Sequence, residues 1–83
     1  MTKVLDGVRE YIQGKSAARP GGQPVADEQS LFRLGIIDSM GVFEIVTFLE
    51  DRFGVEIHDE EILRKNFDSI QRIAQFVSAK MTA

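Results

Sequence analysis

Apolar residues recur along the chain at intervals of three and four, which is the spacing of amphipathic helices. The first set comprises Val4, Leu5, Val8, Tyr11 and Ile12. The second set comprises Val42, Ile45, Val46, Leu49 and Phe53. The third set comprises Ile70, Ile73, Ala74 and Val77. Each set occupies one face of a helix, so the pattern predicts three main helices that pack these faces together.

The central helix has the clearest end signals, and we expect it to run from 39 to 53. Asp38 is a good N-cap, because its carboxylate can accept hydrogen bonds from the N–H groups of the first turn. Gly54 is a good stop at the other end. The side opposite the apolar face is mixed, and it comprises Met40, Phe43, Glu44, Thr47 and Asp51.

Two more helix starts are predicted in the second half of the chain. A short helix should follow the extended link in "VEIHDEEIL", with Asp59 as its cap and with Ile62 and Leu63 pointing inward. In the last helix, Asp68 and Gln71 have the spacing of a capping box. The predicted fold is therefore all-α, a small four-helix bundle of three main helices and one short helix.

A long connection separates the first helix from the central one. We expect the first helix to stop at Gly14, and residues 15–24, "KSAARPGGQP", to form a flexible loop because of their prolines and glycines. The segment after this loop is too apolar to be fully solvated, so it should lie across the core. Its apolar residues are Leu31, Phe32, Leu34, Ile36 and Ile37. Ordered connections of this length are usually functional.

The chain has 83 residues, which is enough for a single domain spanning 1–83. It has no cysteine, so it can form neither a disulfide framework nor a thiolate metal site. It also lacks an apolar run of membrane-spanning length, and its N-terminus lacks the apolar region of a signal peptide. We therefore expect a monomeric cytoplasmic protein with no membrane span.

The net charge of −3 is unevenly distributed along the chain. Residues 38–61 hold eight acidic residues and one basic residue, a net charge of −7, and the remainder of the chain carries +4. Nucleic acid is a poor partner for such an acidic surface, because phosphate binding needs clustered lysine and arginine. A basic protein surface is the natural complement. An acidic face kept only for solubility is the simpler alternative.

A catalytic role for Ser39 finds little support. A hydrolytic serine needs a base and an orienting acid, but the single histidine, His58, lies in an acidic link. The window "IDSMG" also fails the G-x-S-x-G pattern of a nucleophile elbow. His58 and the three acidic residues after it match no calcium or zinc motif. We therefore predict a protein that is not an enzyme and that holds no metal.

Modification by another enzyme fits Ser39 better than catalysis does. It lies at a predicted helix start after a long loop, where its hydroxyl is accessible. A helix N-terminus offers free N–H groups and positive dipole charge, which suit a phosphate-linked group. Met40 and Phe43 beside it would form an exposed apolar pair on which a partner could dock.

The segment "GIIDSMGVFEIVTFLEDRFGVEIHDEEI" resembles the centre of an acyl carrier protein. That family is marked by Asp-Ser and a bulky apolar residue at the start of an acidic amphipathic helix, here Asp38, Ser39 and Met40. The resemblance extends over nearly the whole chain. Leucine is more common at position 40, and an acid often stands at position 41, where this chain has glycine. The run "DSMG" is closer to D-alanyl and other stand-alone carriers than to housekeeping fatty-acid carriers.

The resemblance implies a four-helix bundle in which Ser39 receives 4′-phosphopantetheine from coenzyme A through a phosphopantetheinyl transferase. Asp38 would assist this reaction, which also uses magnesium. The thiol of the arm would hold an acyl or aminoacyl group as a thioester. Ligases or synthases with basic docking surfaces, in fatty-acid, polyketide or related biosynthesis, would load and use it. The implied partner face comprises Met40, Phe43, Glu44, Thr47, Asp51, Asp59, Glu60 and Glu61.

Two other functions stay open at this point. The chain could be a non-covalent acidic helical interaction module whose Met40–Phe43 patch binds a partner helix. It could also be a small acidic regulator without covalent chemistry, although that hypothesis leaves the placement of Asp38 and Ser39 unexplained. The identity of the cargo is not encoded in any of these residues, because cargo choice lies mostly with partner enzymes.

Overall fold

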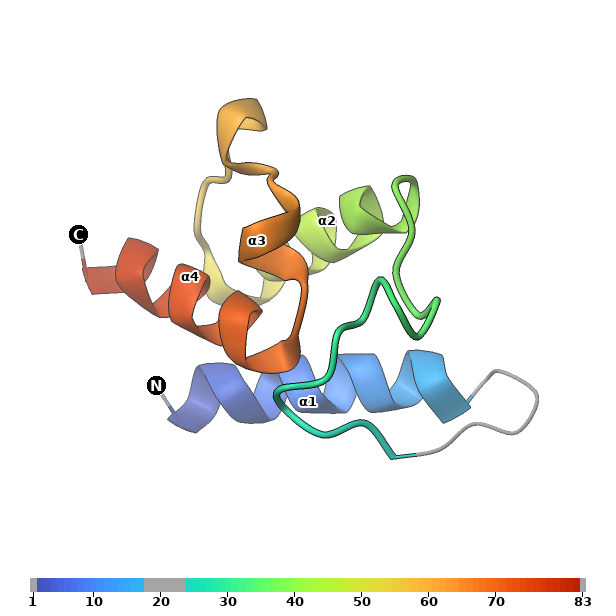
Figure 1. Ribbon diagram of the computed structural model, residues 1–83. Helices are drawn as coiled ribbons and strands as arrows, with labels where there is room; N and C mark the ends of the chain where they lie inside the picture. The colour runs from blue at the N-terminus through green and yellow to red at the C-terminus, as the bar shows by residue number, and fades with distance from the viewer. Residues whose placement is uncertain (1, 18–23, 83) are drawn as a thin grey trace.

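The computed structural model describes residues 2–17 and 24–82. In this part of the chain the elements are α1 (Thr2–Ala17), α2 (Gly41–Phe53), the 3₁₀ turn η1 (Asp59–Glu61), α3 (Arg64–Phe67) and α4 (Ile70–Thr82). The described residues contain no strand, which confirms the all-α prediction. Three of the helices are long and α3 is short (Figure 1), so the fold is a small helical bundle as predicted. The short helix predicted at Asp59 is the 3₁₀ turn η1.

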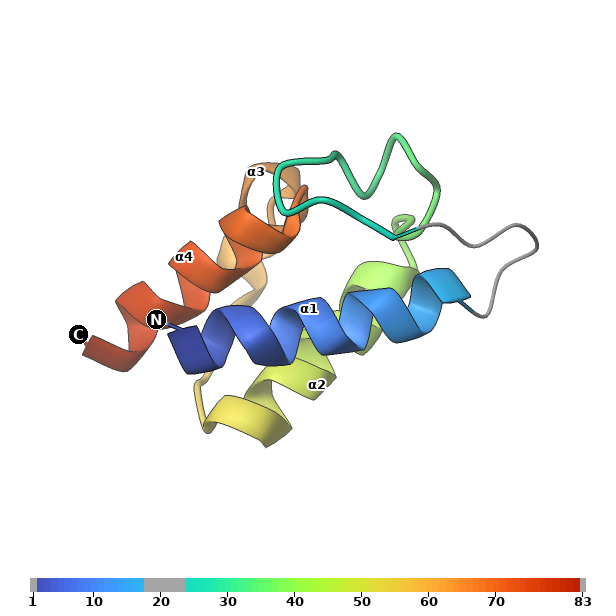
Figure 2. The ribbon, with the colours of Figure 1, turned by 90° about the horizontal axis from the view of Figure 1, so that it is seen from below.

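Helix α4 is central to the packing, because it contacts α1, α2 and α3. The start of α1 and the end of α4 lie at the same end of the molecule, and α1 lies across α2 (Figures 1 and 2). The apolar faces predicted for the three long helices all turn inward. The buried core comprises Val4, Val8, Ile12, Val25, Leu31, Ile37, Val42, Ile45, Val46, Leu49, Ile57, Phe67, Ile70, Ile73, Ala74 and Val77.

Helix α1 is longer than the sequence pattern predicts. It continues through Gly14 to Ala17, so the predicted stop at Gly14 is wrong. A glycine inside a helix costs roughly 1 kcal/mol relative to alanine, which packing of the last turn can offset. That last turn is anchored, since Ser16 is buried and Lys15 contacts α2. The predicted flexible loop therefore loses residues 15–17 to the helix, while positions 18–23 lie outside the described residues.

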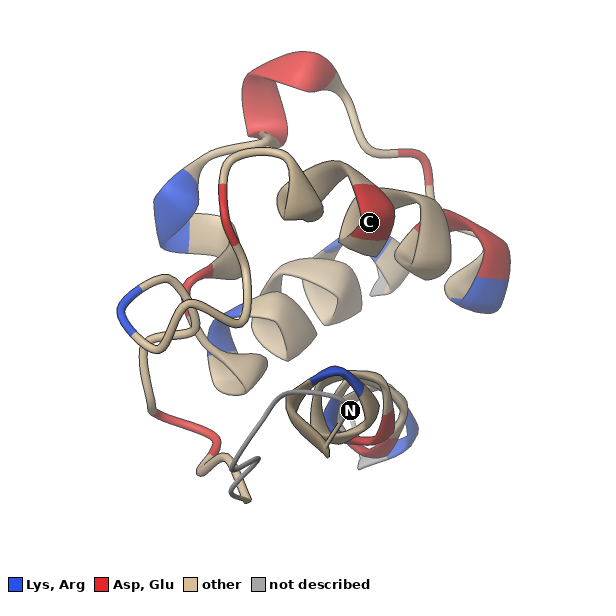
Figure 3. Ribbon diagram, turned by 90° about the vertical axis from the view of Figure 1, so that its right-hand side faces the viewer, with Lys and Arg blue, Asp and Glu red and all other residues tan. Residues whose placement is uncertain are grey.

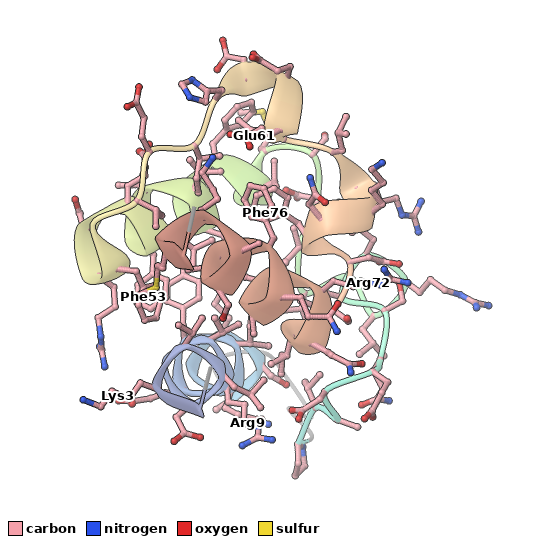
Figure 4. All side chains as sticks on the ribbon, turned by 90° about the vertical axis from the view of Figure 1, so that its left-hand side faces the viewer. Lys3, Arg9, Phe53, Glu61, Arg72 and Phe76 are labelled. Atoms are coloured by element: carbon pink, nitrogen blue, oxygen red, sulfur yellow. The ribbon has the colours of Figure 1, made fainter. Side chains whose placement is uncertain are left out.

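A second glycine in α1 has a packing role. An added Cβ at Gly7 would lie 2.9 Å from Cζ of Phe53, at the end of α2, which is too close for a real contact. Figure 4 shows the Phe53 side chain directed at α1. Gly7 thus allows the Phe53 ring to approach the backbone of α1.

Both predicted end signals of α2 are confirmed. Asp38 caps the first turn, as described below, and Gly54 adopts a left-handed conformation with φ 67°. The N–H of Gly54 donates to the carbonyl of Glu50 at 3.0 Å, which satisfies one of the last free carbonyls of the helix. The assigned helix begins two residues later than predicted, although Met40 already has helical dihedral angles.

The cap of the short 3₁₀ turn differs from the prediction. His58, and not Asp59, occupies the N-cap position of η1. The carboxylate of Glu61 reaches back and accepts a hydrogen bond from the His58 N–H at 3.0 Å. Ile62 packs against the core as predicted, but Leu63 is 44% exposed, so the prediction that it points inward is wrong. The turn is too short to align both side chains with the core.

The cap of α4 also differs from the prediction. Ser69 Oγ accepts a hydrogen bond from the N–H of Arg72 at 3.1 Å, so Ser69 is the capping side chain in place of Asp68. The Asp68 carboxylate instead accepts a hydrogen bond from Ser30 Oγ at 2.6 Å. Asp68 is therefore used to fasten the long connection to the second half of the chain.

The four-residue helix α3 was not predicted separately from α4. Its last residue, Phe67, is fully buried and lies 5.5 Å from Phe76, measured between ring centroids. Such a short helix is not stable by itself, because its nucleation cost exceeds the gain from few hydrogen bonds. Burial of the Phe67 ring is what favours helical structure here.

The connection between α1 and α2 crosses the core as predicted. Leu31 and Ile37 are buried, and the N–H of Leu31 donates to the carbonyl of Asp68 at 2.6 Å. An ion pair of 2.6 Å between Arg9 and Asp27 ties the start of this connection to α1. These contacts fix the position at which the chain enters α2, and therefore the position of Ser39.

Candidate functional site

Ser39 lies at the junction between the long connection and α2. It is exposed, and so are its two neighbours, Asp38 and Met40. The connection before it is held by the buried side chain of Ile37, and the helix after it is held by the buried side chain of Val42. The serine hydroxyl is therefore presented to solvent from a position that is fixed on both sides.

Asp38 organises the backbone around this serine. Its Oδ1 accepts hydrogen bonds from the N–H of Met40 at 3.1 Å and from the N–H of Gly41 at 2.6 Å. The next two N–H groups, of Val42 and Phe43, donate to backbone carbonyls. The expectation of free N–H groups for a phosphate in this turn is therefore wrong at residues 40–43, because Asp38 and the backbone already accept their hydrogen bonds.

Gly41 lies close to the Asp38 carboxylate, which accounts for a residue without a side chain at this position. An added Cβ there would lie 3.2 Å from Asp38 Oδ1, closer than nearly all real Cβ contacts. A side chain at this position would require the Asp38 oxygen to move by a few tenths of an ångström. Gly41 thus leaves the Asp38 oxygen unobstructed, and it also leaves this position of the helix without charge.

The exposed face of α2 matches the prediction. Met40 is 77% exposed and Phe43 is 57% exposed, and both lie within the first turn after Ser39. Thr47, one turn further along, is exposed and donates its hydroxyl to the carbonyl of Phe43 at 3.1 Å. Large apolar side chains at this level of exposure next to an exposed serine form a surface suited to contact with another protein.

Acidic residues are frequent on α2, on the link after it and on η1. Figure 3 shows acidic positions along α2, along the link after it and on η1. Arg52 is the basic residue in the last turn of α2, and α1 carries both signs of charge. Asp51, Asp59 and Glu60 are exposed, and no ion pair within the described residues engages them. These three carboxylates are available to a basic partner.

Glu61 is different from the three free acids. Its carboxylate accepts hydrogen bonds from Lys80 Nζ at 2.7 and 2.9 Å and from the N–H of His58. The hydrogen bonds from Lys80, and then that from His58, lower the pKa of Glu61 below its ordinary value. Figure 4 shows Glu61 beside Phe76 of α4. Glu61 therefore fastens η1 to α4, and its geometry serves the fold.

Glu44 is also engaged within the chain. Its Oε2 lies 2.7 Å from Nζ of Lys15 on α1. The hydrogen bond from Lys15 to Glu44 raises the pKa of the lysine. The sequence analysis did not predict this contact, because no local pattern reports a pair of residues so far apart in the chain.

Other kinds of site are not found near Ser39. Among residues 2–17 and 24–82, no group of three or more histidine, cysteine, aspartate or glutamate side chains is placed to hold a metal ion. No helix in the same ranges has the length and apolar character needed to cross a membrane. A surface hollow lies at the opposite end of α2, between Phe53, Phe76 and Lys80.

Known proteins with similar sequences point to the chemistry of the exposed serine. Residues 7–77 match the family model described as "Phosphopantetheine attachment site". An acyl carrier protein of Thermobifida fusca is 32% identical over 75 residues, which cover 90% of each chain. An acyl carrier protein of Thermosynechococcus vestitus is 28% identical over 82 residues, 99% of this chain and 96% of the relative.

A D-alanyl carrier protein of Streptococcus sanguinis is 31% identical over 51 residues, which are 61% of this chain and 65% of the relative. The family match spans the helices and the long connection that position Ser39. Members of this family interact with phosphopantetheinyl transferases and with biosynthetic enzymes. The chain belongs to the acyl carrier protein family, whose function is to carry a cargo group on a covalently attached 4′-phosphopantetheine.

Proposed function

We propose that Ser39 is the attachment point of the phosphopantetheine and that residues 1–83 act as one carrier domain. The observation that supports this most strongly is an exposed hydroxyl at a fixed helix start. Asp38 on one side caps the helix, and the exposed Met40 and Phe43 lie on the other. Access, rigidity and a docking surface are thus combined at this serine.

The proposed modification is a transfer from coenzyme A. The Ser39 oxygen forms a new bond to the phosphorus that bears the pantetheine, and the phosphorus–oxygen bond to the adenosine 3′,5′-bisphosphate breaks. This bisphosphate is the leaving group, and the hydroxyl proton passes to a base of the transferase. Asp38 assists by holding the first turn of α2 in one conformation, since its Oδ1 binds two consecutive N–H groups.

The thiol of the attached arm supplies the thioester chemistry once bound. The cargo class is an acyl or aminoacyl group, in keeping with the acyl and D-alanyl carriers among the relatives. The chain itself contributes no catalytic step in this proposal. Its one histidine, His58, is exposed in the link before η1, well away from α2's first turn in sequence.

The proposed partners are the transferase and the ligases or synthases that load and use the carrier. Exposed acids at Asp51, Asp59 and Glu60 favour basic docking surfaces on these enzymes, because opposite charges steer association. The exposed apolar pair would contact the partner next to the serine. We propose that the chain does this as a monomer in the cytoplasm, where transferase and coenzyme A are present.

A mass measurement tests the attachment point. The protein is incubated with coenzyme A, magnesium and a transferase of broad specificity, and intact mass is recorded. Wild type should gain the mass of one phosphopantetheine, and Ser39→Ala should stay folded and gain none. Ser78→Ala is the control, because it removes a hydroxyl from α4 and leaves the connection before Ser39 intact, and it should still be loaded. Loading of Ser39→Ala would contradict the assignment.

The same experiment addresses the non-covalent alternative. The exposed Met40 and Phe43 would also suit a helical interaction module that binds partners without any arm. Such a module would show no mass gain in wild type. Its partner binding would also be the same in Ser39→Ala and in wild type, whereas a carrier needs the serine.

A further inference from the structure

Two contacts join α1 to α2 on adjacent helical turns. The rings of Tyr11 and Phe48 are stacked, with centroids 4.2 Å apart and planes at 18°. One turn away, Lys15 Nζ lies 2.7 Å from Glu44 Oε2. Lys15 follows Tyr11 by four residues and Phe48 follows Glu44 by four, so each helix presents both of its residues on one face. The ion pair is thereby placed in register by the aromatic stack.

The position of Lys15 is also fixed from its own helix. Its ammonium lies 5.4 Å from the centroid of the Tyr11 ring, within the range of a cation–π interaction. The lysine side chain is mostly covered, with 29% of its surface exposed, while that of Glu44 is 67% exposed. Lys15 is therefore a restrained cation, whereas the typical surface lysine moves freely and contributes little to an ion pair.

The charge of Glu44 is consequently balanced within the chain. Glu44 follows Ser39 by five residues, or roughly 7.5 Å along the helix axis at 1.5 Å per residue. A cationic group of a partner that approaches Glu44 meets Lys15 as a competitor for the same oxygens. Gly41, between Ser39 and Glu44, has no charge at all. The first two turns of α2 therefore present their apolar residues without available negative charge.

We propose that Lys15 is a specificity-determining residue that masks Glu44 from partner enzymes; this rests on the proposed carrier function. The docking surface is then divided into two parts. The part that follows Ser39 is apolar and consists of Met40 and Phe43. The Asp38 carboxylate before Ser39 already accepts two backbone hydrogen bonds. The acidic part begins at Asp51, roughly 18 Å from Ser39 along the axis of α2.

A partner that fits this surface has an apolar contact area and a separate basic area. It contacts the apolar pair close to the pocket that receives the serine or its arm, and it places basic residues about one helix length away. A partner whose arginine or lysine lies close to the serine-binding pocket should use this carrier poorly, because Lys15 repels that cation.

A double-mutant cycle tests the mask. Rates of loading, as kcat/KM at limiting carrier concentration, are measured with coenzyme A, magnesium and a broad-specificity transferase. The variants are Lys15→Met, Glu44→Gln and the pair together, since methionine keeps an apolar stem against Tyr11. Lys3→Met is the matched control. It removes one positive charge from the same helix, and Figure 4 shows Lys3 projecting away from the bundle.

The mask predicts that Lys15→Met is loaded faster than Lys3→Met, by roughly two- to fivefold, the usual scale of an exposed ion pair. This gain should shrink as salt rises and should disappear when Glu44 is replaced as well. Equal rates for Lys15→Met and Lys3→Met would overturn the proposal, as would a gain that persists in Lys15→Met/Glu44→Gln. Failure of wild type to load would instead refute the carrier function.

Discussion

The two faces of α2 contain similar apolar side chains in different surroundings. Leu49 is fully buried against the core, while Phe43, on the other side of the same helix, is 57% exposed. The buried face fixes the helix on the bundle, and the exposed face is free to contact other proteins. The angle of an apolar residue around the axis of α2 therefore decides whether it packs in the core or stays accessible for the proposed recognition.

The largest expected effect on stability is at the buried face. Leu49→Ala leaves a cavity in the core and should lower the free energy of unfolding by about 2–5 kcal/mol. This is a large share of the stability of a small domain. Urea denaturation followed by circular dichroism measures it. A loss below about 1 kcal/mol would mean that the side chain is not packed as the structure has it.

Substitution of the N-cap of α2, Asp38, should lower the free energy of unfolding by less than Leu49→Ala does. Asp38→Ala removes the oxygen that accepts hydrogen bonds from the Met40 and Gly41 N–H groups. We expect a loss of roughly 1 kcal/mol in the free energy of unfolding, the usual value of an N-cap. Asp51→Ala, at an exposed position on the same helix, is the control for loss of a carboxylate alone. Equal unfolding midpoints for the two variants would argue against the cap.

At the exposed face, stability and recognition should separate. Phe43→Ala should change the free energy of unfolding by less than about 1 kcal/mol, because surface substitutions usually do. It should instead slow loading at Ser39, since it removes docking area beside the serine. Denaturation and the mass-based loading assay are run on the same preparations. If Phe43→Ala were as destabilising as Leu49→Ala, the division between the two faces would be wrong.

The smallest effect concerns Glu61, whose carboxylate accepts hydrogen bonds from Lys80 and His58 within the chain. Because the hydrogen bonds from Lys80 and His58 lower its pKa in the folded state, Glu61 stabilises the protein above its unfolded-state pKa. This contribution is lost as the pH falls through the lower, folded-state pKa. The stability difference between wild type and Glu61→Gln should therefore shrink from about pH 5 downward.

Thermal unfolding of both proteins across this pH range checks the prediction. Lys80→Met removes the main hydrogen-bond donor to Glu61 and should flatten the pH dependence in the same way. A difference between wild type and Glu61→Gln that stays constant with pH would mean that the Lys80 contact does not perturb the carboxylate in solution.

Local sequence patterns determined the parts of this protein that depend on neighbours in the chain. The spacing of Val42, Ile45 and Leu49 set the buried face of α2, and it thereby left Met40 and Phe43 outside. The left-handed backbone conformation after α2 favours glycine, so Gly54 correctly predicted where α2 ends. The exposure of Ser39 followed from the same logic, since it precedes the first buried position of the helix.

Only the tertiary structure decided which distant residues meet. Lys15 and Glu44 are 29 positions apart, and Glu61 and Lys80 are 19 apart, so helical periodicity carries no information about either pair. Packing also extended α1 past Gly14 and formed α3 around the buried ring of Phe67. In both cases burial outweighed local propensity, because the free energy of a buried side chain exceeds the small differences between residues in helix formation.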